Sequence, residues 1–311
     1  MRVSMNVKPV GGAWGGQNQF VQQFIEVLKQ GGHEVTFSLD RHVTHILLLS
    51  VYDYETVTYL PKEVAAFKRK RPQVKVLHRV NDNDERKGTS NVDPAMIEAN
   101  ASADMTVYIS SWLRKYFIQK GMDALEPSCV IHNAVDDTVF HPDDAQPSDD
   151  RFWLVTHHWS DNWMKGFHEY LEIDRMIAEG ELEGVGLRVI GNWPQEIEWR
   201  AAQTHAPVQG PALAEQLKQC HLYVTASRWE PGGMHFIEGL QCGLPVLYHA
   251  DGGGINEVAA PFGLEFRDNL KEQLLQAKAQ METLRQKLVM SEIRPSGMRM
   301  VREYYRVLCE M

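Results

Sequence analysis

Short apolar runs alternate with helix-like segments along the whole chain, and this alternation limits the fold more than any other feature. The apolar runs suit strands buried on both faces of a sheet, and the segments between them suit crossover helices. The strand-like runs are residues 2–7, 33–39, 44–52, 74–80, 104–110 and 128–135, then 152–158, 186–192, 221–227 and 244–250. The pattern predicts an α/β protein with doubly wound parallel sheets.

Residues 140–150, FHPDDAQPSDD, interrupt the alternation with prolines, aspartates and a serine, which is typical of a linker. A chain of 311 residues has room for about two domains. We predict Rossmann-like domains at 1–145 and 151–294, and a last helix within 295–311 that crosses back to the first domain. Ligands bind beyond the carboxyl ends of the strands in such sheets, so we expect the site in a cleft between the two domains.

Charge and cysteine usage exclude several classes of protein. The net charge of -9 argues against binding of nucleic acid, because cations are not in excess to neutralise phosphates. The four cysteines show no Cys-x-x-Cys spacing, so neither a disulfide framework nor a zinc site is expected. The chain opens without a signal-peptide pattern and has no apolar run that could span a membrane. We expect a cytoplasmic protein, and peripheral contact with the inner face of a membrane is compatible with this composition.

The run RWEPGGMHFIEG, residues 228–239, places two glutamates around paired glycines, directly after an apolar strand. Gly232 and Gly233 carry no side chains, and they precede helix N–H groups that have no partner within the helix. Such a bare backbone next to free N–H groups suits a phosphate or diphosphate. Glu238 lies about one and a half turns into the helix and suits the hydroxyls of a ribose. Glu230, in the loop, suits a second polyol. A diphosphate between two polyols describes a nucleotide-sugar.

Each glutamate taken alone has a plainer explanation. A carboxylate near a helix start is favoured by the helix dipole, which explains Glu230, and Glu238 alone reads as a solvated helix residue. The coincidence of a strand, a bare loop and both acids favours the nucleotide-sugar interpretation.

The same run resembles the E-x7-E signature of retaining glycosyltransferases of family 4, which have the GT-B fold of two Rossmann-like domains facing a central cleft. The matching residues are Glu230-Pro231-Gly232-Gly233, Glu238-Gly239, Gly243-Leu244-Pro245-Val246 and Gly253-Gly254-Ile255-Asn256-Glu257. The resemblance implies a metal-independent hexosyltransferase that needs no cofactor. It would move a sugar from a nucleoside-diphosphate donor to an acceptor hydroxyl, in polysaccharide or glycoconjugate synthesis.

The resemblance also assigns residues to the donor. They are Gly15, Gly16, Lys165, Glu230, Gly232, Gly233, Met234, His235 and Glu238. Glu230 would contact the sugar, Glu238 the ribose, and the backbone from Gly232 to His235 the diphosphate. Lys165 matches a lysine that clamps the diphosphate, where a cation stabilises charge on the leaving group. Without the resemblance, Lys165 reads equally well as a surface lysine.

Further candidates depart from the family pattern. The family often places a histidine after an N-terminal strand, near the transferred sugar, and His78 is the match; together with Lys165 and Glu230 it forms the implied catalytic set. A histidine that ends a strand is more often structural, and Asp82 could carry part of this role. The arginine of the family's clamp is missing, and His158 stands in that region. Gly191 belongs to the expected base-binding segment.

The polar segment 82–93 is too long for a simple connection and predicts a mobile loop for the acceptor, a glycan or lipid-linked molecule. Two other functions stay open. One is a non-catalytic nucleotide-sugar-binding subunit, because the clamp arginine is missing. The other is a nicotinamide-dependent oxidoreductase, because doubly wound sheets are shared with that class. The sequence leaves the donor base, the sugar and the acceptor undetermined.

Overall fold

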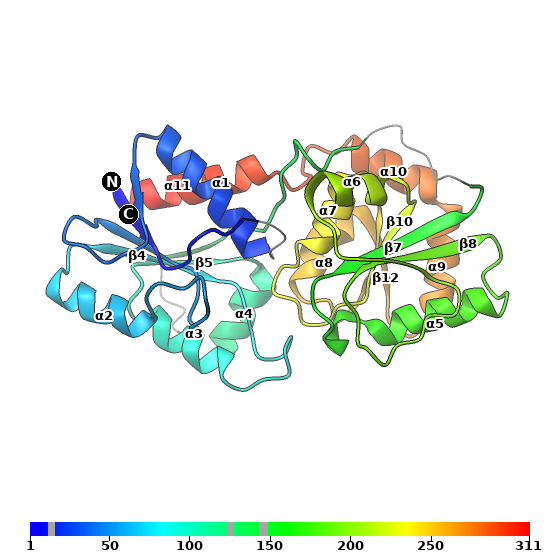
Figure 1. Ribbon diagram of the computed structural model, residues 1–311, viewed down its shortest axis with the longest axis horizontal. Coiled ribbons are helices and arrows are strands. Elements are labelled where there is room, and N and C mark those ends of the chain that lie inside the picture. The colour runs from blue at the N-terminus through cyan, green and yellow to red at the C-terminus, as the bar shows by residue number, and fades with distance from the viewer. Residues whose placement is uncertain (12–15, 123–126, 143–148) are drawn as a thin grey trace. The chain divides into compact units, whose positions relative to one another are not determined.

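The computed structural model describes residues 1–11, 16–122, 127–142 and 149–311. These residues form two compact units, Met1–Asn133 with Gly297–Met311 and Ala134–Ser296, here called unit 1 and unit 2. Among the described residues, each unit contains one parallel sheet of six strands with helices on both faces (Figure 1). The predicted α/β fold with two doubly wound parallel sheets is confirmed.

The sheet of unit 1 has the strand order β2-β1-β3-β4-β5-β6. Its strands are β1 (Arg2–Met5), β2 (Glu34–Thr36), β3 (His45–Leu48), β4 (Lys75–Val80), β5 (Met105–Tyr108) and β6 (Ser128–Val130). Its helices are α1 (Gly16–Gln30), α2 (Pro61–Lys70), α3 (Val92–Asn100), α4 (Ser111–Gln119) and α11 (Gly297–Glu310). Helices α1 and α11 cover one face of this sheet, and α2, α3 and α4 cover the other (Figure 1).

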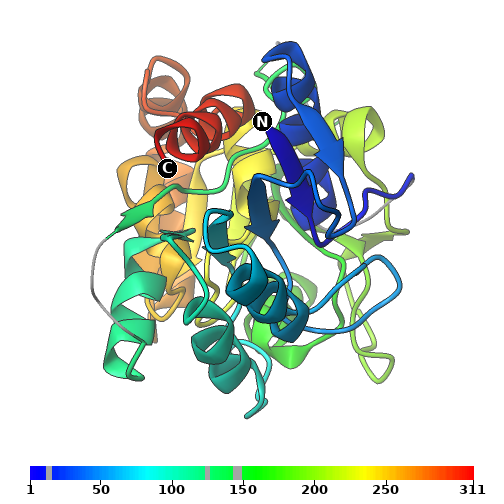
Figure 2. The ribbon, with the colours of Figure 1, turned by 90° about the vertical axis from the view of Figure 1, so that its left-hand side faces the viewer.

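The last helix, α11, packs beside α1 in unit 1 (Figure 2). Its apolar residues recur at helical spacing and are buried, and the ring of Tyr304 lies 4.7 Å from that of Phe20 on α1. The buried guanidinium of Arg79 lies over the Phe20 ring and donates to the Tyr304 hydroxyl at 3.1 Å. It also donates to Oδ1 of Asn133 at 2.7 Å. Arg79 therefore contacts both the last residue of the first segment of unit 1, Asn133, and the helix with which the chain returns to unit 1, α11.

The sheet of unit 2 has the order β12-β11-β10-β7-β8-β9. Its strands are β7 (Phe152–His158), β8 (Val185–Gly191), β9 (Gln203–His205), β10 (Leu222–Thr225), β11 (Val246–His249) and β12 (Gly263–Phe266). Its α-helices are α5 (Phe167–Ala178), α6 (Gly210–Lys218), α7 (His235–Gln241), α8 (Gly254–Ala259), α9 (Leu270–Ala279) and α10 (Met281–Val289), and η1 (Trp163–Lys165) and η2 (Ala260–Phe262) are 3-10 turns. The strand order reverses between β7 and β10. In doubly wound sheets, ligands bind at such a switch point, beyond the carboxyl ends of the strands.

Alternate residues of β7 face the two layers of helices. Trp153 and Val155 pack in a core with residues of α6 and α7, whereas Leu154 packs with residues of α5 on the other face. Val135 and Phe140 also belong to the first of these cores. Unit 2 therefore begins before the predicted boundary at residue 145, because the apolar contacts of these two side chains lie within the core of unit 2.

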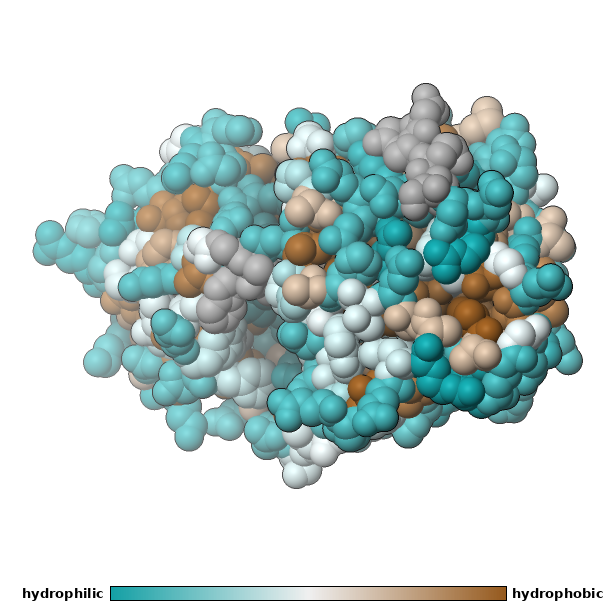
Figure 3. Space-filling view, turned by 45° about the vertical axis from the view of Figure 1, so that its right-hand side comes forward, coloured by the Kyte–Doolittle hydropathy of each residue, from teal (hydrophilic) through white to brown (hydrophobic). Residues whose placement is uncertain are grey.

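The surface in Figure 3 is mostly hydrophilic, with apolar side chains gathered in small patches. Within the described ranges, no helix combines the length and the apolar character that a membrane span requires.

Candidate functional site

The residues of unit 2 that are predicted to bind a donor lie around its switch point. Strands β7 and β10 are hydrogen-bonded neighbours, and both run toward this edge. Lys165 comes from η1, which follows β7, whereas Glu230, His235 and Glu238 come from the loop after β10 and from α7. The parallel sheet thus brings together groups that are far apart in the sequence.

Lys165 and Glu230 form a close ion pair. The Nζ atom lies 2.7 Å from Oε2, and the two side chains are only 13% and 8% exposed. Asn162 caps the turn that carries Lys165 by accepting a hydrogen bond from the N–H of Met164 at 2.8 Å. Gly166 ends the turn at φ 92°, where a Cβ atom would meet Ala226 at 2.3 Å. The local sequence therefore fixes the backbone at Lys165. The charge of the Lys165 side chain is neutralised by Glu230.

The backbone around Glu230 is held by a second loop. The N–H of Trp229 donates to the carbonyl of Asp251 at 2.8 Å, and the N–H of Gly254 donates to the carbonyl of Glu230 at 2.8 Å. Gly253 has φ 70°, and a Cβ atom there would lie 2.8 Å from the Glu230 carbonyl oxygen. Among the described residues, Trp229 is the one non-glycine residue with positive φ, at 48°. Such backbone strain persists where its surroundings hold it, often at functional sites.

The paired glycines lead directly into a helix, as the sequence predicts. Helix α7 begins at His235, one residue after Met234. A Cβ atom on Gly233 would lie 2.6 Å from the His235 ring, so the bare backbone makes room for that ring. His235 Nε2 lies 3.0 Å from the Thr225 hydroxyl, and Gly232 is half-buried. The assignment of a diphosphate to this backbone stays a prediction.

Glu238 occupies a more interior position than the sequence suggests. The residue is 5% exposed, and Oε2 lies 2.7 Å from Nε2 of His157, the penultimate residue of β7. Within the described part of the chain, Oε1 has no hydrogen-bond partner, and it is not one of the buried unpartnered atoms. This oxygen therefore reaches solvent, while the rest of the carboxylate is enclosed. The interpretation of Glu238 as a solvated helix residue is wrong.

His158 faces the interior of unit 2. It is 4% exposed, and its Nε2 atom lies 3.0 Å from both the Thr156 and Tyr170 hydroxyls. Burial lowers the pKa of His158 well below its ordinary value. An enclosed ring with two hydroxyl partners fits a structural role, and the donor contact of His158 stays a prediction. Gly191 has φ 113°, and a Cβ atom there would lie 2.0 Å from the His158 carbonyl oxygen. Glycine at this position therefore allows the ends of β7 and β8 to approach each other closely.

The structure also corrects the position of His78 in unit 1. His78 lies within β4 rather than at its end, and it is 1% exposed. Its Nδ1 atom lies 2.9 Å from Oδ1 of Asn100, and burial lowers the pKa of His78 to about 4. His78 is enclosed in this conformation, and within the described part of the chain its Nε2 atom is buried without a hydrogen-bond partner. Its catalytic role stays a prediction.

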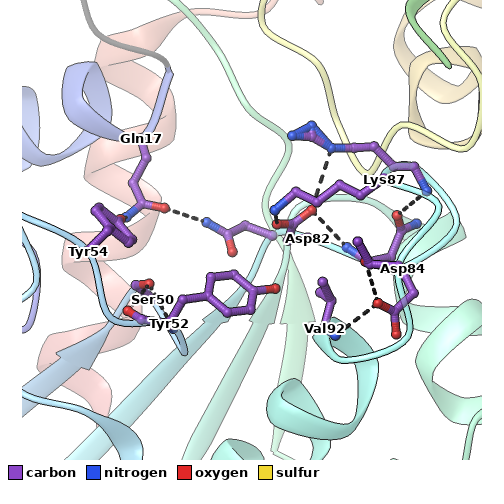
Figure 4. Close-up of polar contacts among 12 residues, drawn as sticks. Gln17, Ser50, Tyr52, Tyr54, Asp82, Asp84, Lys87 and Val92 are labelled. Carbon is purple, nitrogen blue, oxygen red and sulfur yellow. Dashed lines mark hydrogen bonds and ion pairs between the residues drawn. The ribbon is translucent and has the colours of Figure 1, made fainter. Parts of the chain in front are cut away.

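Asp82 lies just beyond the carboxyl end of β4 (Figure 4). Its side chain is 13% exposed and forms ion pairs with Lys87 and with Arg86, the latter at 3.5 Å. The Lys87 ammonium lies 5.0 Å from the centre of the Tyr52 ring. Asp82 is therefore at the edge where His78 was expected, and its charge is balanced by neighbouring cations.

The loop that follows, predicted to be mobile, is densely hydrogen-bonded. Asp84 accepts hydrogen bonds from the Thr89 hydroxyl at 2.6 Å, from the Val92 N–H at 2.9 Å and from the Asp93 N–H at 3.0 Å (Figure 4). Asp93 accepts one in return from the N–H of Asp84 at 3.0 Å. These contacts brace the segment against the start of α3 and favour a fixed surface.

The glycine loop before α1 lies only partly within the described residues. Gly16 is the first residue of α1, and Gly15 lies outside the described ranges. Next to Gly16, Gln17 accepts a hydrogen bond from the Asn81 side chain at 2.9 Å and donates to the Tyr54 hydroxyl at 2.9 Å (Figure 4).

In the described ranges, no three His, Cys, Asp or Glu side chains are arranged to hold a metal ion.

Sequence reasoning missed His157 as a partner of Glu238, and it missed Tyr223. The adjacent histidines at the end of β7 were a visible signal. The alternation of side chains along a strand could have separated their two directions, because neighbouring residues point to opposite faces.

Most of the sequence of unit 2 matches a known family model. Residues 143–288 match the model described as "Glycosyl transferases group 1". Comparison of the sequence with curated proteins gave no match.

Solved structures give a match over nearly the whole chain. Sucrose-phosphate synthase from Thermosynechococcus elongatus matches with a TM-score of 0.70 and 15% identity, over 99% of this chain and 98% of that one. HepE from Anabaena, in complex with UDP-glucose, matches with a TM-score of 0.71 and 15% identity over 100% of both chains. WaaG, a glycosyltransferase involved in lipopolysaccharide biosynthesis, gives 0.68 and 13% over 99% of each. The chain therefore has the GT-B fold of these glycosyltransferases, and its residues 143–288 match the group 1 family model.

Proposed function

We propose that this chain is a retaining glycosyltransferase of family 4 that transfers a hexose-like sugar from a nucleoside-diphosphate donor to an acceptor hydroxyl. The observation that carries the proposal is the Lys165–Glu230 pair at the switch point of unit 2. A cation suited to a diphosphate stands 2.7 Å from a carboxylate suited to sugar hydroxyls. The E-x7-E spacing and the family match of residues 143–288 support the same conclusion.

In the proposed reaction, Lys165 binds the diphosphate and stabilises the charge that develops on it as the sugar leaves. Glu230 releases the lysine and accepts hydrogen bonds from the sugar hydroxyls. The leaving phosphate takes the proton of the acceptor hydroxyl on the same face of the sugar, so the anomeric configuration is retained and neither glutamate is a covalent nucleophile. We infer that Lys165 and the backbone N–H groups near Gly233 supply the positive charge for which other transferases use a metal ion.

The donor class is supported by one of the similar structures. HepE was solved in complex with UDP-glucose, which favours a nucleotide-sugar donor for the similar fold here. The acceptor is proposed to be a glycan or a lipid-linked molecule, reached from the cytoplasm.

A lipid-linked acceptor would require contact with a membrane surface, and one segment of unit 2 suits it. Met290 and Ile293 are 76% and 65% exposed, Lys287 and Arg294 flank them, and Glu292 lies between them. Apolar side chains beside cations favour an anionic bilayer. Sedimentation with phosphatidylglycerol vesicles should exceed that with phosphatidylcholine vesicles, and the double variant Met290→Asp/Ile293→Asp should abolish the difference. Equal sedimentation of the variant and the wild-type protein would contradict this assignment.

The activity is tested by incubating the full chain with UDP-, GDP- and ADP-sugars and measuring release of the nucleotide. Glu230→Gln and Lys165→Met should each lower the rate about 100-fold or more, since each removes a contact to the sugar or to the leaving group. Lys271→Met is the matched control, because Lys271 forms an exposed ion pair with Glu181 at the same 2.7 Å. This control should keep the wild-type rate.

Other outcomes separate the alternatives. Thermal stabilisation by a nucleotide-sugar without any turnover would favour a non-catalytic binding subunit. A change in NADH fluorescence on mixing would favour an oxidoreductase. Turnover that survives in both site variants would refute the proposed roles of Lys165 and Glu230.

A further inference from the structure

The proposed reaction gives no task to His157, although this histidine lies beside the candidate site. It is 3% exposed, and both of its ring nitrogens have partners. Nε2 lies 2.7 Å from Oε2 of Glu238 on α7, and Nδ1 lies 3.0 Å from the hydroxyl of Tyr223 on β10. The same hydroxyl accepts a hydrogen bond from the backbone N–H of His157 at 3.1 Å. Three elements of unit 2 therefore meet at one ring.

The directions of these hydrogen bonds form a closed set. An ionised carboxylate only accepts hydrogen bonds, so Nε2 of His157 must carry a hydrogen and donate it to Glu238. If the ring is neutral, Nδ1 is an acceptor for the Tyr223 O–H, which also lies 3.4 Å from the His157 carbonyl oxygen. The Tyr223 oxygen in turn accepts the backbone N–H. Buried polar networks whose members are all satisfied fix the geometry of the groups in them.

The packing around Tyr223 reinforces this arrangement. Tyr223 is fully buried, and the residue after Glu238 is Gly239, where a Cβ atom would lie 2.4 Å from the tyrosine ring. Any other residue at 239 would push the helix and the ring apart. Glycine here therefore lets Tyr223 stand close to α7, next to the carboxylate that His157 holds.

One oxygen of Glu238 is left for another partner. His157 occupies Oε2, while Oε1 reaches solvent and lacks a hydrogen-bond partner in the described part of the chain. Because the carboxyl group is planar, fixing Oε2 also fixes the direction of Oε1. The enclosed pair thus presents a single oriented acceptor at the switch point.

We propose that His157, supported by Tyr223, is a positioning residue that aims Oε1 of Glu238 at the ribose hydroxyls of the donor. It thereby makes the site select ribonucleotides over deoxyribonucleotides. This inference rests on the proposed function, since it needs a nucleotide in unit 2.

The test compares binding of matched nucleotides to the full chain by calorimetry. The pairs are UDP with 2′-deoxy-UDP, GDP with 2′-deoxy-GDP, and ADP with 2′-deoxy-ADP, so the base need not be known beforehand. A hydroxyl that donates to a carboxylate contributes about 1.5–3 kcal/mol. The wild-type protein should therefore bind the ribonucleotide about 10- to 100-fold more tightly than its deoxy partner.

Two variants of His157 isolate its role. In His157→Gln the side-chain amide reaches the position of Nε2 and can still donate to Glu238, so the preference for ribose should be retained. In His157→Asn the shorter amide reaches only the position of Nδ1, so the preference should fall to about 3-fold or less. Both variants bury one neutral amide, and a merely structural histidine would change their stability without separating them in ribose selectivity.

Several results would overturn the inference. One is a wild-type protein that binds the ribo and deoxy partners equally, which leaves the proposed function standing because a nucleotide still binds. If no nucleotide binds at all, the proposed function itself fails. Equal selectivity in His157→Gln and His157→Asn would also refute the positioning role. Should neither variant fold, nitrogen NMR of the wild-type protein decides. A hydrogen on Nε2 of His157 supports the inference, and an unprotonated Nε2 refutes it.

Discussion

Replacement of Glu230 by Gln, or of Lys165 by Met, should destabilise unit 2, because each change removes the opposite charge from a buried group. The two charged atoms lie 2.7 Å apart, and the side chains are 13% and 8% exposed. Removal of one partner from a buried ion pair costs about 3–5 kcal/mol. For a domain of this size, that corresponds to a fall in Tm on the order of 10 °C. The double variant leaves neither charge behind and should recover most of the loss.

A double-mutant cycle measures the coupling between the two charges. Urea unfolding of the four proteins without nucleotide gives a coupling energy, which we expect to be about 2 kcal/mol or more. The control cycle uses Lys271 and Glu181, whose charged atoms are also 2.7 Å apart but whose side chains are 43% and 34% exposed. An exposed pair should give about 0.2–1 kcal/mol. Distance is the same in both pairs, so the difference reports burial.

The two single variants should have opposite effects on nucleotide binding. A free nucleoside diphosphate should bind Glu230→Gln at least as tightly as the wild-type protein. In this variant Lys165 does not have to break an ion pair with a carboxylate before it binds the phosphate. Lys165→Met should bind about 10-fold more weakly, since it loses a charged hydrogen bond. Equal coupling energies in the two cycles, or weaker nucleotide binding by Glu230→Gln, would refute this account of the pair.

Three further predictions concern other parts of the fold. Gly253→Ala should lower transfer activity far more than Gly180→Ala. Both glycines have positive φ, 70° and 76°, but only a Cβ atom at 253 would collide with backbone, 2.8 Å from the Glu230 carbonyl oxygen. Equal activities of the two variants would contradict this. Burial lowers the pKa of His78 from 6.5 to about 4, so only the unfolded state gains this proton between those pH values. The contribution of His78 to stability should be complete above pH 6.5 and fall by about 1.4 kcal/mol per pH unit toward pH 4, so the slope in urea titrations should be smaller by this amount in the His78→Leu variant. Tyr304→Phe should cost unit 1 about 1–2 kcal/mol in urea unfolding, because the buried guanidinium of Arg79 loses an acceptor at 3.1 Å, and no loss would contradict this.

The parts of the fold that sequence predicted are those with a local signal. The apolar residues of each strand run identify it without reference to distant residues, and the helix after the paired glycines begins beside Met234 as expected. The linker was predicted from composition, which marks turn-forming residues but not packing. Composition therefore gave no sign that Val135, before the polar stretch, and Phe140, its first residue, already pack in the core of unit 2.

The site was harder to predict because its contacts join distant residues. Lys165 and Glu230 are 65 positions apart, and His157 and Glu238 are 81 positions apart. Neither pair leaves a spacing pattern, since the strand order of the sheet brings them together. His78 shows a second limit: the apolar run 74–80 identifies β4 and its end, but it does not show whether the side chain at position 78 faces a site or the interior.

Helices α9 and α10 follow each other in the chain but pack on opposite faces of the sheet. Leu274 and Ala277 of α9 pack on one face of the sheet, whereas Leu288 of α10 packs in the core on the other face. The chain therefore has to turn between the two helices, at Gln280, where φ is -104° and ψ is 9°.

The two glutamates of the E-x7-E run are held in different ways, and this difference bears on how a donor would enter. Glu230 is held by a lysine that the proposed reaction needs for the diphosphate, so binding has to exchange one contact for another. Glu238 is held by His157, whose ring nitrogens both face protein groups, so this contact can persist in the complex. In an acidic chain of net charge -9, a self-neutralised Lys165–Glu230 pair keeps a buried cation available for a dianion. Donor binding would then rearrange one carboxylate while the other is already oriented.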